Sequence, residues 1–140
     1  MLKKTVVVAS LVALALAATA YAGNGAGSNK SSSSYISPPI VVSSALSATS
    51  TSGPQYRDWI TFDVSTTATS NPYVNLYCYQ NGTLVLRSTL AYFAGNKDGA
   101  FGLYSSWWTG GAADCTANLD MPTNSGKWKT LTSTSFHVDA

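Results

Sequence analysis

The segment YVNLYCYQNGTLVLRSTLAY, residues 73–92, decides the fold class. Two runs rich in aromatic and aliphatic residues flank Asn81-Gly82, a dipeptide that favours a tight hairpin turn because both residues tolerate positive φ. Bulky side chains occupy both faces of this hairpin, so we expect one face in the core and the other to be a tyrosine-rich surface or a secondary contact. A two-residue turn predicts the pairs Gln80–Thr83, Cys78–Val85 and Leu76–Arg87.

Alternating patterns on both sides of the hairpin predict further strands. In residues 59–65 the apolar residues Ile60, Phe62 and Val64 share one face. Residues 113–120 alternate more regularly, which is typical of a strand with one buried and one wet face. The face expected to be buried holds Ala113, Cys115, Ala117 and Leu119, and the wet face holds Asp114, Thr116, Asn118 and Asp120.

Residues 127–139 predict a last strand, in which Leu131 breaks the alternation. We therefore expect either an outward Leu131 or a β-bulge near Ser133. An early strand is suggested by Ile40, Val42 and Leu46, which follow Pro38-Pro39. About seven short strands separated by turn signals predict an all-β, two-sheet antiparallel sandwich over residues 35–140, with a small closed barrel as the alternative.

The first residues have the composition of an export signal. Lys3 and Lys4 precede an apolar run, and Ala20-Tyr21-Ala22 supplies small residues where a signal peptidase cleaves. The run is short and rich in alanine, so we expect a cleaved signal peptide over residues 1–22 and no stable membrane span. Residues 23–34 are Gly, Ser and Asn-rich and predict a flexible linker.

The charge balance excludes several classes of function. Only 10% of the residues are charged, all six acids are Asp, and the single histidine is His137. Removal of residues 1–22 takes away two lysines and leaves equal numbers of basic and acidic residues. A phosphate-binding surface needs clustered Lys and Arg, whereas these are scattered here. We therefore expect no nucleic-acid partner.

Two cysteines, Cys78 and Cys115, are the only ones in the chain. In an exported protein they predict one structural disulfide, because the compartment is oxidising. The alternatives are a reactive thiol or a metal pair, but one histidine and no second cysteine pair do not supply the ligands of a zinc site. We expect no metal and no cofactor.

The chain resembles immunoglobulin-like sandwiches and a group of small secreted bacterial proteins of unassigned function. The resemblance rests on the segments NLYCYQNG, GGAADCTANL and TSTSFHV and covers residues 58–140. It implies a two-sheet fold with Cys78 and Cys115 bridged, and it implies no activity. The chain lacks the tryptophan and the corner tyrosine of antibody domains, so we expect the cysteines on neighbouring strands of one sheet.

The sequence contains no clear catalytic set. The six aspartates are spread along the chain, and Asp114 and Asp120 are expected on a solvated face. A Ser-His-Asp arrangement would have to use His137, which we interpret as an ordinary strand histidine. Residues 96–98 loosely suggest calcium ligands but are too few for a site.

Aromatic side chains are the remaining candidates for ligand contact, because exposed aromatics stack on sugars or pack against proteins. The candidates are Trp59, Tyr77, Tyr79, Trp107 and Trp108. The competing interpretation is that Trp107 or Trp108 fills the core and Trp59 covers a sheet edge. The sequence favours a secreted, non-catalytic interaction or structural module that binds a protein or a surface polymer. The alternative is a small extracellular enzyme inhibitor acting through residues 95–99, and a hydrolase is the least favoured.

Overall fold

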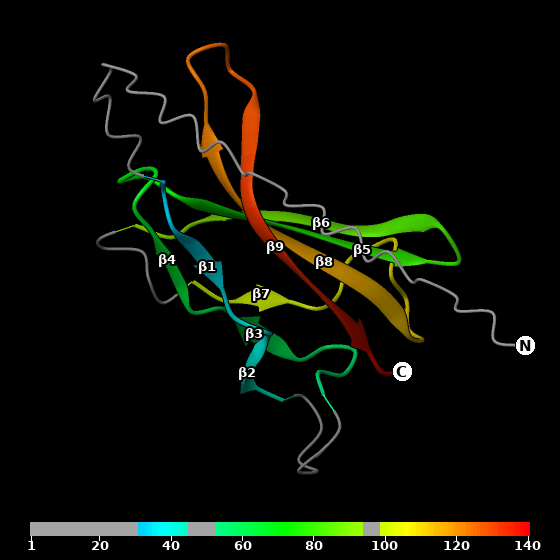
Figure 1. Cartoon of the computed structure of the whole chain (residues 1–140). Helices are drawn as coiled ribbons and strands as arrows, with labels where there is room; N and C mark the ends of the chain where they lie inside the picture. Colours follow the sequence, from blue (N-terminus) through cyan, green and yellow to red (C-terminus); the bar gives the residue numbers. More distant parts are fainter. Residues whose placement is uncertain (1–30, 45–52, 94–98) are drawn as a thin grey trace, which may run out of the picture. The chain divides into compact units, whose positions relative to one another are not determined.

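The computed structural model describes residues 31–44, 53–93 and 99–140, and this part of the chain is all-β (Figure 1). The paired strands are antiparallel and the described residues contain no helix, as the alternating sequence patterns predict. The strands are β1 (Ser34–Ile36), β2 (Ile40–Ser43), β3 (Trp59–Thr61), β4 (Val64–Thr66), β5 (Tyr73–Gln80), β6 (Thr83–Ala91), β7 (Phe101–Gly102), β8 (Ala113–Pro122) and β9 (Trp128–Val138).

These strands form three sheets, where the sequence predicted two. One sheet has the order β6-β5-β8-β9, the second β2-β3-β7, and the third contains only β1 and β4. The two small sheets are built from the same two stretches of chain: β1 pairs with β4, and β2, which follows β1, pairs with β3, which precedes β4. Pro38-Pro39 separates β1 from β2, and proline cannot donate to a ladder. Ser37 bridges the interruption, since its N–H donates to the Asp63 carbonyl at 2.9 Å.

The β5–β6 hairpin has the expected turn but a different register beyond it. Asn81 and Gly82 both have positive φ (49° and 79°), and Gln80 pairs with Thr83. Cys78 pairs with Leu86, however, and Leu76 with Ser88, so the pairs predicted for Cys78 and Leu76 are wrong. The reason is a β-bulge, which leaves Val85 as an extra residue and buries both Val85 and Leu86.

A second bulge lies in β9. Leu119 pairs with Thr132 and Asp120 with Thr130, so Leu131 is the extra residue. Of the two alternatives predicted from the sequence, an outward Leu131 is wrong, and the bulge is present but lies two residues before Ser133. Leu131 is half-buried and packs against the core, and this contact favours the bulge at Leu131.

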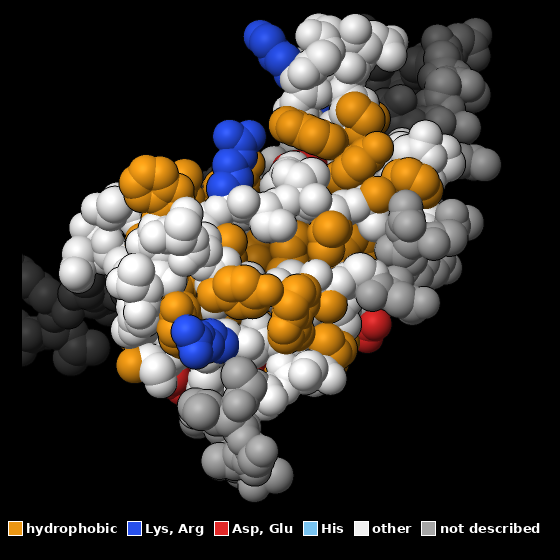
Figure 2. All heavy atoms as spheres, turned by 180° about the vertical axis from the view of Figure 1, so that it is seen from behind, with side chains coloured by type: hydrophobic (Ala, Val, Ile, Leu, Met, Phe, Trp, Pro, Cys, Tyr) orange, Lys and Arg blue, Asp and Glu red, His pale blue; other side chains and the backbone are white. Residues whose placement is uncertain are grey.

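The core lies between the four-stranded sheet and the small sheets. The predicted inner residues of β8 are buried, as are Ile60 and Phe62, whereas Val64 is half-buried. The early strand is present as β2, although its three apolar residues are exposed and Leu46 lies outside the described residues. Figure 2 shows that apolar side chains reach the surface in several separate groups, while the basic side chains on that face form no patch.

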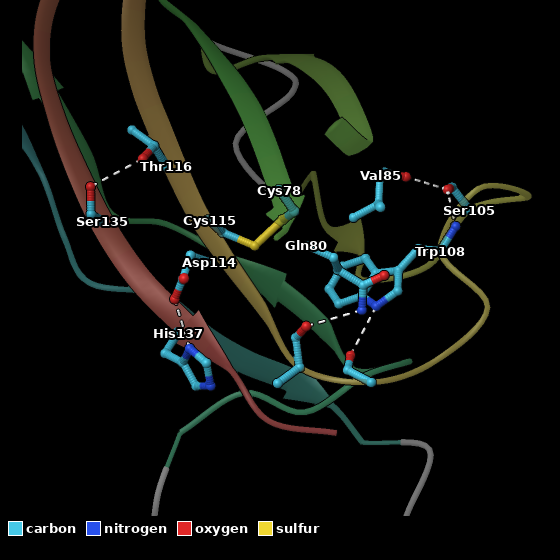
Figure 3. The surroundings of a disulfide bond; sticks show 12 residues. Cys78, Gln80, Val85, Ser105, Trp108, Asp114, Cys115, Thr116, Ser135 and His137 are labelled. Atoms are coloured by element: carbon cyan, nitrogen blue, oxygen red, sulfur yellow. Dashed lines mark hydrogen bonds and ion pairs between the residues drawn. A yellow bond between two sulfur atoms is a disulfide. The ribbon is translucent and has the colours of Figure 1, made fainter. Parts of the chain in front are cut away.

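The predicted disulfide between Cys78 and Cys115 is present (Figure 3). The two residues are directly opposed on β5 and β8, with their Cα atoms 4.1 Å apart, and both side chains are buried. The bond therefore joins neighbouring strands of one sheet, whereas the bridge of antibody domains joins two sheets. It connects residues 37 positions apart in the sequence and fixes β5 against β8.

The N-terminal segments expected to be a signal peptide and a linker lie mostly outside the described residues, since residues 1–30 are not described. Strand β1 begins at Ser34. In the part of the chain that the structure describes, no helix is long and apolar enough to span a membrane.

Candidate functional site

The adjacent tryptophans of the β7–β8 loop lie in opposite environments. Trp108 is 0% exposed and packs in the core, where its ring centroid is 5.4 Å from that of Tyr56. Its indole N–H donates to the Gly111 carbonyl at 3.0 Å, and its own carbonyl accepts from the Tyr56 hydroxyl at 2.9 Å. Trp108 is therefore unavailable to a ligand: it is wrong as a ligand-contact candidate, and the competing interpretation, that one of the two tryptophans fills the core, is confirmed.

Hydrogen bonds attach the β7–β8 loop to the β5–β6 hairpin (Figure 3). The Ser105 hydroxyl donates to the Val85 carbonyl and accepts from the backbone N–H groups of Trp107 and Trp108, each at 3.0 Å. The Gln80 side chain donates to the carbonyls of Gly110 and Ala112 at 2.8 and 3.0 Å. The loop is thus held from two strands, which fixes the position of the residues that it carries.

Trp107 projects from this loop and is 81% exposed. It borders a surface hollow of about 450 Å³ along β6, the edge strand of the four-stranded sheet. We call this hollow the β6 hollow; it is lined by Leu84, Val85, Leu86, Arg87, Ser105 and Trp107. An exposed tryptophan on an anchored loop beside an apolar hollow can bury a large contact area without first being ordered.

Tyr77 and Tyr79 extend the β6 hollow onto the outer face of the sheet. Tyr79 pairs with Leu84 and Tyr77 with Arg87, and each pair shares a face of the sheet. The Arg87 guanidinium lies 5.8 Å from the Tyr77 ring centroid, which is within cation–π range. Because the bulge at Val85 shifts the register by one residue, it also determines which β6 side chain stands beside Tyr77.

Trp59 belongs to a different surface. It lies on β3 in the small three-stranded sheet and packs against Tyr104, with ring centroids 5.8 Å apart. Trp59 is not among the residues that line the β6 hollow. Of the five aromatic candidates, the structure thus gathers Tyr77, Tyr79 and Trp107 around one hairpin, leaves Trp59 apart and buries Trp108.

His137 lies beside two aspartates on the surface, an arrangement that the sequence did not reveal. Its Nδ1 lies 2.7 Å from Oδ1 of Asp114, and its Nε2 lies 3.8 Å from Oδ1 of Asp139. The only available signal was the β8–β9 pairing, which places Asp114 opposite His137 once the register is known. Nδ1 is thus within hydrogen-bond distance of one carboxylate, and Nε2 lies near a second one but beyond hydrogen-bond distance.

Asp120 is on the outer face of β8, but the expectation that it is solvated is wrong. It is 2% exposed, and its Oδ2 accepts a hydrogen bond of 2.5 Å from the Asn75 side chain. Asn75 is also buried and accepts a hydrogen bond from Thr89. The burial has a structural cause, because aromatic residues from β5 and β9 meet over this part of β8.

Tyr92 is a buried phenol at the start of the segment that follows β6. Burial raises its pKa above the ordinary 10.0, while hydrogen bonds with the Thr61 side chain and the Phe62 backbone act in the opposite direction. Its hydroxyl lies 3.2 Å from Oγ1 of Thr61 and donates to the Gly99 carbonyl at 3.2 Å. Tyr92 therefore favours its neutral form in the folded protein.

The described residues contain no group of three or more His, Cys, Asp or Glu side chains that could hold a metal ion. Residues 94–98, which include most of the loop considered for calcium or for an inhibitory role, lie outside the described residues. No protein-family model matches the chain, and comparisons with curated proteins and with solved structures give no significant match.

Proposed function

We propose that this protein is a secreted, non-catalytic interaction module that binds a protein or a surface polymer through the β6 hollow and the tyrosines beside it. Export is supported by the signal-like composition of residues 1–22 and by the disulfide, which is a bond typical of oxidising compartments. The residues of the predicted linker that precede β1 would then give the folded unit clearance from the membrane or wall during export.

The single observation that carries this proposal is the position of Trp107. Its side chain is 81% exposed, whereas that of the next residue, Trp108, is buried in the core. Folding gains little from an exposed indole, whereas binding gains much, because tryptophan and arginine are enriched among the residues that dominate interface energies. Leu84 is 44% exposed in the same hollow, and Arg87 supplies a charge at its rim.

The architecture proposed for this module is an immunoglobulin-like sandwich. The packing of a four-stranded antiparallel sheet over small sheets, with an apolar core between them, supports a layered β fold. The disulfide within one sheet is a departure from the antibody pattern, so loops like those of antibodies are not part of the proposal.

A non-catalytic role agrees with the surroundings of His137. A hydrolase of the Ser-His-Asp type needs a hydroxyl or thiol at the second ring nitrogen, and here that nitrogen faces Asp139 at 3.8 Å. All three side chains are substantially exposed, so the arrangement also lacks the water-excluded environment that strengthens catalytic electrostatics.

A comparison of two tryptophan variants tests the proposal. Purified protein lacking residues 1–22 is applied to a glycan array and to a panel of extracellular proteins, together with Trp107→Ala and Trp59→Ala. Trp59 is the matched control because it is exposed but lies on β3 in the three-stranded sheet. We expect a specific signal that Trp107→Ala abolishes and Trp59→Ala retains. Equal signals from both variants, or no signal from the parent protein on either panel, would refute the proposal.

A further inference from the structure

The carboxyl group of Asp120 is buried with one oxygen unsatisfied. Its Oδ2 accepts from Asn75, but Oδ1 has no hydrogen-bond partner in the structure. A buried acceptor without a partner is costly, and a buried carboxylate is more costly than a neutral group. Such groups are rare in native proteins and often belong to sites for ligands, ions or catalysis.

Aromatic rings enclose this carboxyl group on the outer face of the sheet. Tyr73 on β5 is the direct partner of Asp120, while Trp128 on β9 pairs with Pro122, at the next position of β8 on that face. The rings of Tyr73 and Trp128 are 5.1 Å apart although β8 lies between their strands. They therefore meet over β8 beside Asp120. Phe93 packs against Tyr73 at 5.8 Å and extends the aromatic cluster.

The chemistry of this arrangement selects an organic cation. A carboxylate beneath aromatic rings attracts positive charge, because the faces of the rings are also negative. A divalent metal would require several oxygen ligands, and the described residues hold no cluster of three acidic, His or Cys side chains. The unsatisfied oxygen needs an N–H donor, which a quaternary ammonium lacks. A primary ammonium group and a guanidinium group both meet these requirements. The guanidinium of arginine pairs best with both oxygens of a carboxylate, and Oδ2 of Asp120 already accepts from Asn75, so the single free oxygen favours the compact ammonium group.

The depth of Asp120 decides between sources of that group. Because Oδ1 is buried, the ammonium must arrive at the end of a slim, flexible apolar stem, with Trp128, 44% exposed, as the outer wall. Lysine has such a stem, whereas the amine of an amino sugar is attached directly to a bulky ring. Lys129 follows Trp128 in β9, so alternation directs it to the opposite face.

We propose that Asp120, Asn75, Tyr73 and Trp128 form a binding site for the lysine side chain of a partner protein. The rings of Tyr73 and Trp128 touch each other in the free protein, so the stem would displace the exposed Trp128 ring and pack against it. The ammonium group would then donate to Oδ1 of Asp120. This site uses different residues from the β6 hollow, so it stands or falls independently of the proposed function.

Nuclear magnetic resonance on the unmodified protein lacking residues 1–22 provides the first test. Two signals report on the site: the Asn75 side-chain amide, which donates to Asp120, and the Trp128 indole N–H. n-Butylammonium is titrated beside n-butanol, which has the same stem without charge, and tetramethylammonium, which has charge without an N–H donor. We expect saturable shifts of both signals with n-butylammonium only. Equal responses to n-butanol or tetramethylammonium, or no response to n-butylammonium, would overturn the assignment.

A second comparison separates the sources of the amine and the role of Asp120. Nα-acetyl-lysine methylamide should shift the two signals, and glucosamine should not; equal binding of glucosamine would contradict the lysine assignment. Asp120→Asn keeps the size of the side chain and should weaken n-butylammonium binding at least about tenfold, as expected for loss of a hydrogen bond to a charged group. Thr116→Val, on the same face of β8, should leave binding unchanged. Unaltered binding in Asp120→Asn would also refute the site.

Discussion

Removal of the disulfide is the perturbation whose magnitude follows most directly from the structure. In the double variant Cys78→Ala/Cys115→Ala the unfolded chain has more conformational entropy, because the bond no longer restricts it. The bond joins residues 37 positions apart, and the chain-entropy model assigns about 4 kcal/mol to a loop of that length. Small domains have net stabilities of about 5–15 kcal/mol, so the variant should lose a large fraction of its free energy of unfolding.

Urea unfolding followed by tryptophan fluorescence measures this loss, because Trp108 is fully buried and reports on the core. We expect the free energy of unfolding to fall by about 4 kcal/mol and the m-value to rise, since the unfolded state without the bond exposes more surface. The control is a reducing agent, which should lower the midpoint of the parent protein toward that of the variant and leave the variant unchanged. A loss below about 1 kcal/mol would refute the assignment of the bond as the main covalent constraint on the fold.

The remaining predictions concern the core, the hairpin turn and the response to alkaline pH. Trp108→Ala should lower the free energy of unfolding by about 3–5 kcal/mol in urea titrations, and a loss near zero would contradict its core position. Gly82→Ala should lower the free energy of unfolding by about 1–2 kcal/mol, because φ at this position is +79°; an added Cβ would meet no neighbouring atom, so the cost comes from the backbone conformation alone. Asn81→Gly is the control and should change the free energy of unfolding little. Tyr92 has a raised pKa when folded, so its stabilising effect is complete below pH 10 and is lost as the pH rises through the folded pKa. Tyr92→Phe should therefore reduce the decline in stability above pH 10, as measured by urea midpoints, and an identical decline would contradict the assignment.

The parts of the fold that depend on local chemistry could be predicted from the sequence. Asn81-Gly82 specifies a tight turn, because both residues tolerate the positive φ that they adopt. The buried face of β8 follows from strict alternation between positions 113 and 119. The disulfide was predicted from the presence of two cysteines in a chain whose first residues have the composition of an export signal. The predicted placement of the cysteines on neighbouring strands is also correct.

The parts that depend on side chains distant in sequence could not be predicted. The bulges at Val85 and Leu131 let extra apolar side chains reach the core, and alternation alone does not locate such shifts. Asp120 has the pattern of a solvated residue, yet the contact between Tyr73 and Trp128 encloses it. That contact joins strands on either side of β8 and is visible only when the sheet order is known.

The candidate site shows the same division. The sequence identified Tyr77, Tyr79 and Trp107 as aromatic candidates but had no means of deciding which of two adjacent tryptophans faces solvent. The backbone N–H groups of both tryptophans donate to the Ser105 hydroxyl, and in the resulting loop conformation Trp108 lies in the core and Trp107 outside. Leu84 and Arg87 joined the candidates only once the hairpin register and the position of the loop were known.

One dissociation constant tests the central claim most directly. It is that of the partner selected by the array or the protein panel, measured by isothermal titration calorimetry for the parent protein and for Trp107→Ala. A residue that dominates an interface contributes at least about 2 kcal/mol, so the variant should bind at least about 30-fold more weakly while keeping the parent's urea midpoint. Equal dissociation constants for the two proteins would show that the β6 hollow does not recognise the partner and would contradict the account.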